Sequence, residues 1–418
     1  MRGAAVNMAA VSSVSRLQDL PSDPLLHVLS YLSFRDLLSC SHVCRRLNDL
    51  SKHNPLWKRL CHQHWLLKES DRAQSALSWY DLFVQTYSDL GRYVDVYAEL
   101  KHTWDQLTAF LQLKCPRIIA SLKEGATESE LDAVEAQIEL KLPNDYRCSC
   151  RIHNGQKLVI PGLMGSMSLS NHYRSEVLLD VETAAGGFQT RPGMKLCLPL
   201  TFCFHTGLSQ YLSLDHEEGR TRGEVFYPCP NQRASDPSAI DMFITGSSFS
   251  SWFSSYVQNV VSGEFPIIRD QIFRYVHEKG CVATTDDITV SVSTSFLPEL
   301  SSVHPPHYFF TYRISEQRGG VPGGHPTLPH GVSPVQKTTD QTETRGRGGG
   351  GERLFSLVVA QHLTQQHTHR LSCSGGGGWW TLVDVGGRWW TLVDVGGGWW
   401  TLVDVGVEAP KEKAELFK

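Results

Sequence analysis

The sequence predicts a multidomain protein with an all-α N-terminal segment, an α+β middle domain, a partial β-sandwich and a disordered repetitive tail. Apolar residues recur at helical spacing over residues 17–100, and short strand-like runs separated by Gly, Pro and polar turns follow them. Near the C-terminus, the block WWTLVDVG begins at Trp379, Trp389 and Trp399. The chain has 418 residues, 41% hydrophobic and 20% charged, which suits two to four globular domains.

The composition also excludes several classes of function. A net charge of −4 gives no bulk positive field that would attract nucleic acid or anionic lipid. No apolar run approaches the roughly 18 residues that span a bilayer, and residues 1–16, predicted to be disordered, lack the apolar core of a signal peptide. The 11 cysteines are irregularly spaced, as reduced thiols are. We therefore predict a cytoplasmic and/or nuclear protein whose partners include neither nucleic acid nor membrane.

Residues 17–66 carry the signals of three short helices. Ser22 or Asp23 can cap the first helix, and Ser33 and Asp36 have the spacing of a capping box. The apolar stripes contain Leu25, Val28, Leu29 and Leu32 in the first helix, Leu37, Cys40, Cys44 and Leu47 in the second, and Leu56, Trp57, Leu60 and Cys61 in the third. A unit of about 45 residues buries little surface, so it either docks on the next domain or presents an apolar face to a partner.

The residues of this segment resemble an F-box in their order. The resemblance rests on Leu20-Pro21-x-Asp23, Leu29-Ser30-Tyr31-Leu32, Asp36-Leu37, Val43-Cys44-Arg45 and Leu56-Trp57-Lys58. An F-box implies binding to the S-phase kinase-associated adaptor of a cullin–RING (SCF) ubiquitin ligase. The positions that the resemblance assigns to adaptor contact, or to its support, are Leu20, Pro21, Leu25, Leu29, Leu37, Val43, Leu56 and Trp57. The alternative is a plain N-terminal helical bundle.

Residues 67–102 are predicted to be a helical connector, and residues 103–258 a mixed domain. Thr127 and Glu130 form a capping box, and Asn154-Gly155 is a helix stop. Strand-like runs follow, and the segment AIDMFITGSSFSSWFSSYVQNVVSGE reads as a closing helix. This order of elements, with the signature Leu142-Pro143-x-Asp145-Tyr146, resembles the SUKH superfamily (the Smi/Knr-type domain). The resemblance implies a protein-binding α+β domain.

No constellation of catalytic or metal-binding residues is visible. Cys148-x-Cys150 and Cys61-His62-x-His64 are isolated half-sites, which are better explained by helix packing. The spaced Cys/His pairs of a RING finger, a Gly-x-Ser-x-Gly elbow, a P-loop and a Rossmann glycine motif do not occur. The sequence therefore predicts a protein that is not an enzyme and uses no cofactor and no metal. A cryptic enzyme in the mixed domain is left as a third class of hypothesis, without a nominated nucleophile.

Residues 266–315 are β-patterned. Residues 288–294 alternate apolar and polar side chains, and residues 307–314 form a second strong strand signal. They resemble the opening strands of an ApaG domain, an immunoglobulin-like sandwich. The resemblance ends after Ser315, which leaves two or three strands with open edges and half a core. We therefore expect a truncated ApaG-like domain that does not fold as it does in the family.

Residues 316–418 are predicted to be a disordered, low-complexity tail that contains the WWTLVDVG repeats. Only residues 354–363 are apolar enough for a short ordered element. The repeats could form stacked hairpins or aggregate, since they are rich in β-formers and poor in charge. Their near identity and ten-residue period instead favour a translated tandem DNA repeat, or an error in the gene structure, over a working module.

The sequence as a whole predicts a substrate-recognition subunit of an SCF E3 ubiquitin ligase. Its F-box would bind the adaptor and, through it, the cullin, while the downstream domains would present protein substrates. The alternative is a non-ligase binding scaffold with no adaptor, in which the helical segment packs on the next domain. The first hypothesis predicts that Leu29→Ala with Trp57→Ala abolishes adaptor binding. The second predicts that Leu29 and Trp57 are buried without any adaptor.

Overall fold

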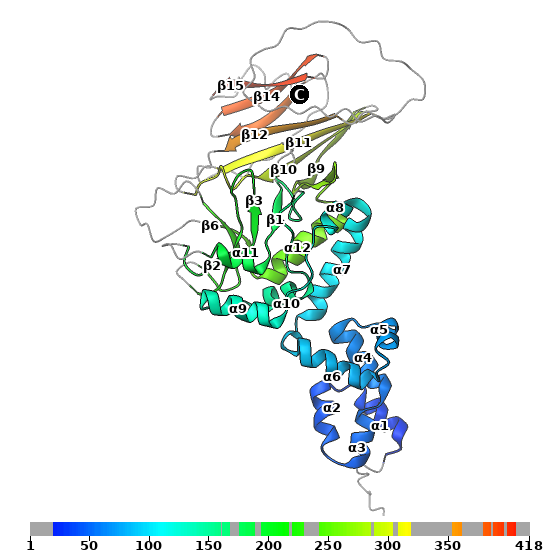
Figure 1. Ribbon diagram of the computed structural model, residues 1–418. Coiled ribbons are helices and arrows are strands. Elements are labelled where there is room, and N and C mark those ends of the chain that lie inside the picture. The colour runs from blue at the N-terminus through cyan, green and yellow to red at the C-terminus, as the bar shows by residue number, and fades with distance from the viewer. Residues whose placement is uncertain are drawn as a thin grey trace, which may run out of the picture. The chain divides into compact units, whose positions relative to one another are not determined.

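The computed structural model divides the chain into two units, residues 1–102 and 103–418, which are described separately (Figure 1). The description covers residues 20–159, 161–167, 175–188, 194–216, 220–229, 242–285, 288–303, 308–318, 353–361, 379–385, 388–396 and 399–406. Residues 1–16, for which the sequence predicts disorder, lie outside this description.

The first unit is all-α, as predicted. Its helices are α1 (Ser22–Leu29), α2 (Phe34–Ser41), α3 (Arg45–Ser51), α4 (Asn54–Trp65), α5 (Glu69–Ser75), α6 (Trp79–Leu90), the 3-10 turn η2 (Gly91–Tyr93) and the start of α7 (Tyr97–Lys114). The second predicted helix, with Leu37, Cys40, Cys44 and Leu47, is therefore two helices, α2 and α3. The break occurs because Cys44 is extended (φ −157°) and serves as the N-cap of α3, while the Asn48 amide donates to the Ser41 carbonyl oxygen at 3.0 Å.

Helix caps explain most of these boundaries. The Ser33 hydroxyl accepts a hydrogen bond from the Asp36 N–H at 3.2 Å, and the Asp36 carboxylate accepts one from the Ser33 N–H, which is the predicted capping box. The first helix differs from the prediction, since its N-cap is Pro21, which makes no side-chain cap. Ser22 and Asp23 instead lie inside its first turn, where the Asp23 carboxylate faces the positive end of the helix dipole.

The first unit has an apolar core of its own. Trp57 is 1% exposed, and its indole N–H donates to the Ser51 carbonyl oxygen at 2.6 Å. Phe83 of α6 packs tilted or edge-on against Trp57, Phe34 and Trp65. The predicted connector is therefore part of the same core as the predicted F-box. The buried members are Leu29, Phe34, Leu37, Leu56, Trp57, Leu60, Cys61, Trp65, Trp79, Leu82, Phe83 and Val94.

The second unit begins with an α+β region, which confirms the predicted fold class. Its helices, after α7, are α8 (Pro116–Ile119), α9 (Glu128–Ile138), α10 (Asn144–Ile152), α11 (Val181–Gly186) and α12 (Phe249–Ser262). Its strands are β1 (Glu176–Leu178), β2 (Cys197–Pro199), β3 (Thr201–Cys203), β4 (Tyr211–Ser213), β5 (Val225–Pro228) and β6 (Met242–Gly246). They form an antiparallel sheet in the order β2-β4-β5-β6 and a separate β1-β3 pair.

Two details of this region differ from the prediction. The segment expected as one closing helix is strand β6 followed by α12, because Ser248 is extended and caps the helix by accepting from the Ser251 N–H. Gly155 has a φ of +67°, but α10 has already ended at Ile152. Asn154 serves the next helix instead, since its side-chain oxygen accepts from the Val181 N–H at 2.9 Å.

Residues 266–275 complete the α+β region, although the sequence assigned them to the next domain. They contain the hairpin of β7 (Ile267–Ile268) and β8 (Gln271–Ile272), and Phe273 forms a parallel bridge with Ser166. Ile272 and Tyr275 are fully buried. Residues 266–275 therefore pack against the α+β region and belong to it; we call this segment the strap.

The β region that follows is a four-stranded antiparallel sheet. Its strands β9 (Val276–Thr285), β10 (Ile288–Phe296), β11 (Tyr308–Arg318) and β12 (Arg353–Gln361) pair in the order β12-β11-β10-β9 (Figure 1). Strand β11 thus extends past the predicted boundary at residue 315, and β12 comes from the segment assigned to the tail. Whether this sheet corresponds to an ApaG domain stays a prediction.

The three repeats form a separate antiparallel sheet in the order β13-β14-β15. These strands are β13 (Trp379–Val385), β14 (Arg388–Gly396) and β15 (Trp399–Gly406). The described strands of the repeats pair side by side in one sheet. The rest of residues 319–418 lies outside the described part of the chain.

Candidate partner-binding surface

Most of the predicted adaptor-binding residues belong to the core of the first unit. None of this group exceeds 4% exposure, so a partner cannot reach them while the unit is folded. They can act only by holding the helices in place. The group consists of Leu25, Leu29, Leu37, Leu56 and Trp57.

The other three predicted residues are accessible. Val43 is 63% exposed in the turn between α2 and α3, Pro21 is exposed, and Leu20 is half-buried. The carbonyl oxygen of Leu20 accepts a hydrogen bond from the Arg46 guanidinium at 2.6 Å, which fixes this N-terminal segment against α3. The structure therefore separates the eight predicted positions into five supporting residues and three surface residues.

Further exposed apolar residues lie on the same helices. Val28 is 44% exposed and Tyr31, just beyond α1, is 76% exposed, and their spacing of three residues places them near each other on one side. Leu38 of α2 is 37% exposed. The sequence placed Val28 in one apolar stripe with Leu25 and Leu29, and the structure divides that stripe, because Leu25 and Leu29 are buried while Val28 is exposed. Tyr31 stood in the F-box motif and could have been nominated from it, since exposed tyrosines are enriched at interfaces.

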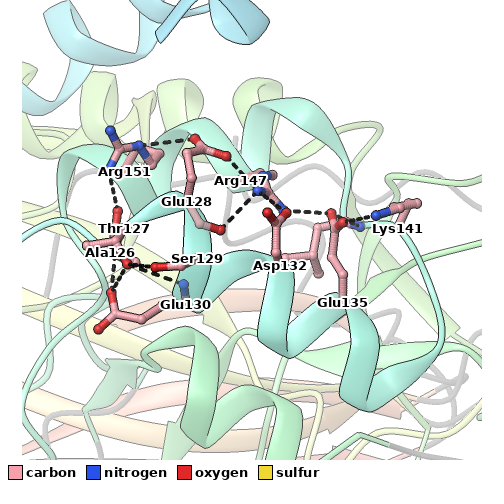
Figure 2. A network of polar contacts seen from close by, with 11 residues as sticks. Ala126, Thr127, Glu128, Ser129, Glu130, Asp132, Glu135, Lys141, Arg147 and Arg151 are labelled. Atoms are coloured by element: carbon pink, nitrogen blue, oxygen red, sulfur yellow. Dashed lines mark hydrogen bonds and ion pairs between the residues drawn. The ribbon is translucent and has the colours of Figure 1, made fainter. Parts of the chain in front are cut away.

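The α+β region contains a network of ion pairs around a buried arginine (Figure 2). Arg147 of α10 is fully buried and lies 2.6 Å from Glu128, 2.7 Å from Asp132 and 3.0 Å from Glu135 of α9. Burial would raise the pKa of Glu135, but the hydrogen bond from Lys141 and the charge of Arg147 outweigh it and lower that pKa. The network joins α9 to α10 and leaves the guanidinium no open side for a substrate.

A second buried carboxylate, Glu176 of β1, joins the strap to the α+β region. Its oxygens accept hydrogen bonds from the Tyr227 hydroxyl at 2.5 Å and the Thr201 hydroxyl at 2.6 Å, and the Arg274 guanidinium pairs with it. Burial raises the pKa of Tyr227 well above its usual value, so the phenol keeps the proton that it donates. The cavity beside Glu176 measures about 10 Å³, which is room for about one water and not for a substrate.

The cysteines of the two half-sites are buried thiols. Burial raises the pKa of Cys61 and of Cys150 to about 12, and it raises that of Cys148 as well. Thiols that hold their protons so strongly are poor nucleophiles and poor ligands. Within the residues that the structure describes, no three His, Cys, Asp or Glu side chains are grouped as a metal site would require.

Comparison with known proteins gives two family matches. Residues 17–63 match the F-box-like family, and residues 125–255 match the SMI1 / KNR4 family (SUKH-1). These matches confirm both resemblances. No helix in the described part of the chain is long and apolar enough to cross a membrane.

The chain is also similar to whole proteins. Human F-box only protein 3 is 67% identical over 298 residues, which are 71% of this chain and 63% of that protein. The bovine F-box only protein 3 is 66% identical over 310 residues, covering 73% and 66%. The F-box protein SKIP16 of Arabidopsis thaliana is 23% identical over 328 residues, covering 70% and 74%. The chain therefore spans slightly less than two thirds of the length of its mammalian relatives.

Proposed function

Because the chain carries an F-box-like domain and resembles F-box only protein 3 over 71% of its length, we propose that it is the substrate-recognition subunit of an SCF (cullin–RING) E3 ubiquitin ligase. In this role it breaks and forms no bonds. It binds the S-phase kinase-associated adaptor, and through it the cullin, and raises the local concentration of a protein substrate near the ubiquitin-charged enzyme.

The observation that carries this proposal is the F-box-like match together with the exposed apolar residues inside it. We propose that the adaptor contacts the accessible side of α1, α2 and the turn that follows. Interfaces are built on a few large apolar anchors that become desolvated, and Tyr31 and Val43 are the most exposed large apolar side chains among the described residues of the first unit. The proposed contact residues are Leu20, Pro21, Val28, Tyr31, Leu38 and Val43.

The buried predicted residues have a supporting role in this proposal. Truncating Leu29 or Trp57 to alanine would cost about 2–5 kcal/mol of stability, so a loss of adaptor binding in those variants would report unfolding. Surface substitutions separate contact from support. The SUKH-1 domain, together with the β9–β12 sheet, would present the substrate.

The test is co-expression of the full chain with the adaptor, followed by size-exclusion chromatography. The parent chain should co-elute with the adaptor as a stoichiometric complex. Val43→Glu combined with Tyr31→Ser should abolish co-elution while the helical circular dichroism is unchanged. The matched control is Val84→Glu, which alters an apolar residue of α6 that is 45% exposed and outside the proposed contact. Equal co-elution of all three proteins would refute the assigned surface.

The second candidate is a binding scaffold without an adaptor. Leu29 and Trp57 are 2% and 1% exposed in the chain alone, which agrees with the scaffold hypothesis. Supporting residues of an adaptor-binding unit would be buried in the same way, so this burial does not separate the two. A well-folded parent chain that elutes without the adaptor would establish the scaffold.

A further inference from the structure

We propose that a groove across α4, α5 and the start of α6 binds an acidic peptide segment of a partner protein. This goes beyond the proposed adaptor contact, because the groove lies on other residues of the first unit. Its volume is about 690 Å³, within the range of roughly 300–1,000 Å³ of ligand-binding clefts. It is lined by Asn54, Pro55, Lys58, Arg59, His62, Glu69, Arg72 and Trp79.

The local sequence explains why these side chains meet. Pro55, Lys58, Arg59 and His62 stand at i, i+3, i+4 and i+7 of α4, which is one face of a helix. Glu69 and Arg72 stand at i and i+3 of α5, so they also lie on one face of their helix. The first backbone N–H of α6 donates to the Asn54 side-chain oxygen at 3.1 Å, which joins the start of α6 to the start of α4.

The floor of the groove is the indole of Trp79, which is 4% exposed. Three basic groups surround this ring. The Lys58 ammonium lies 5.9 Å and the Arg72 guanidinium 6.0 Å from its centroid, and the His62 ring centroid lies 5.4 Å away. These side chains cover the indole, so the surface that the groove presents to a partner is mainly positive.

The charge of this groove is opposite to that of the whole protein. Lys58, Arg59 and Arg72 face one carboxylate, Glu69, whereas the chain carries a net charge of −4. Charge complementarity of this kind steers association and selects partners. An acidic segment is therefore the occupant that the groove fits.

The ion pairs with Glu69 do not prevent Lys58 and Arg72 from binding a carboxylate of a partner. Glu69 bridges Lys58 at 2.5 Å and Arg72 at 3.3 Å, but the three side chains are between 41% and 57% exposed. Pairs this exposed contribute little to stability, so exchanging Glu69 for an incoming carboxylate costs little. Glu69 then acts as an internal competitor that holds the two cations in place when no peptide is bound.

An acidic peptide fits better than a free anion or a lipid headgroup. A single anion can bridge Lys58 and Arg72, as the Glu69 carboxylate does at 2.5 Å and 3.3 Å. An extended acidic chain can in addition place a second carboxylate near Arg59, whose guanidinium also donates to the Leu32 carbonyl oxygen at 2.8 Å.

The test is fluorescence anisotropy of the full chain with a fluorescein-labelled (Glu-Ala)4 peptide at low salt. Saturable binding is expected, and it should weaken steeply with salt because the contacts are exposed. Lys58→Gln with Arg72→Gln should weaken binding about tenfold. Glu69→Gln should tighten it severalfold, a change of opposite sign that a folding defect cannot mimic. Lys52→Gln, a matched change of an exposed cation outside the groove, should alter the affinity less than twofold.

Several outcomes would overturn the proposal. These are the absence of saturable binding, equal weakening by Lys52→Gln and by the double variant, and an unchanged affinity in Glu69→Gln. Inorganic phosphate that displaces the peptide at equal concentration would replace the peptide with a simple anion. Stronger binding to vesicles containing phosphatidylserine than to the peptide would replace it with a membrane surface.

Discussion

The ion pair between Glu176 and Arg274 should be a main determinant of the stability of the second unit. Glu176 is 2% exposed and the Arg274 side chain 13%, so both charges are largely shielded from water. Arg274→Met keeps much of the aliphatic length but removes the charge. Breaking a buried pair by removing one partner costs about 3–5 kcal/mol, because the other charge stays buried and uncompensated. We therefore expect Arg274→Met to lower the free energy of unfolding by that amount.

A double-mutant cycle separates this charge effect from lost packing. Glu176→Gln removes the carboxylate charge. The Tyr227 and Thr201 hydroxyls donate to different oxygens of Glu176, so the one amide oxygen of glutamine can accept from only one of them, and the other hydroxyl has to accept from the amide N–H. The double variant should be more stable than the sum of the two single effects predicts, by about 0.5–3 kcal/mol. Arg117→Met, at an exposed arginine of α8, should change the stability by less than about 0.5 kcal/mol.

The measurement is urea unfolding of the full chain together with hydrogen exchange of the β3 and β5 amides. The exchange rates report opening of this region even where the two units unfold separately. If Arg274→Met unfolds within about 0.5 kcal/mol of the parent, the ion pair contributes little. Strictly additive effects in the cycle would refute the coupling.

Three further predictions concern the same unit. A fragment of residues 97–275 should unfold cooperatively, whereas residues 97–265, which keep α12 but lack the strap, should not, since each large apolar side chain of the missing strap contributes about 1.5–3 kcal/mol. Equal calorimetric transitions of the two fragments would contradict this. Gly155→Ala should lower the free energy of unfolding by at least about 1–2 kcal/mol, because its φ is +67° and the new Cβ would lie 2.5 Å from the Leu179 carbonyl. Thermal unfolding measures this, and an unchanged melting temperature would refute the assigned backbone conformation. The pKa of Glu135 is lowered in the folded state from a usual 4.5, so its contribution is present above about pH 4.5 and is lost as the pH falls through the folded pKa. Glu135→Gln should flatten the acid side of a stability profile from about pH 3 to 7, and parallel profiles would argue against this role.

Local signals in the sequence predicted local structure well. The capping boxes at Ser33 and Thr127 follow from spacing alone, and both form. The α+β character of the middle region follows from alternating helical and strand-like runs.

These local patterns do not predict contacts between residues that are far apart in the sequence. An arginine at a helical position normally indicates a solvated face, yet Arg147 is buried because three carboxylates of α9 converge on it. No sequence motif contains Arg274, because its partner Glu176 is 98 positions away. The same limit explains β12, whose pairing with β11 crosses a long intervening segment.

The candidate surface was only partly predictable for a related reason. A motif marks which positions matter without separating those that touch a partner from those that hold the helices. Val28 and Leu29 are neighbours in one apolar stripe, but they are 44% and 2% exposed. The distinction depends on how α1 packs, which the sequence of α1 alone does not specify.

The strap also limits the rotation of the β9–β12 sheet relative to the α+β region. Tyr275 is fully buried, and β9 begins at the next residue, so no linker separates the sheet from the α+β region. Phe243 of β6 makes a second contact, 4.9 Å from the ring of Phe296 in β10. A protein bound to this sheet would therefore be held in a fixed orientation relative to the α+β region.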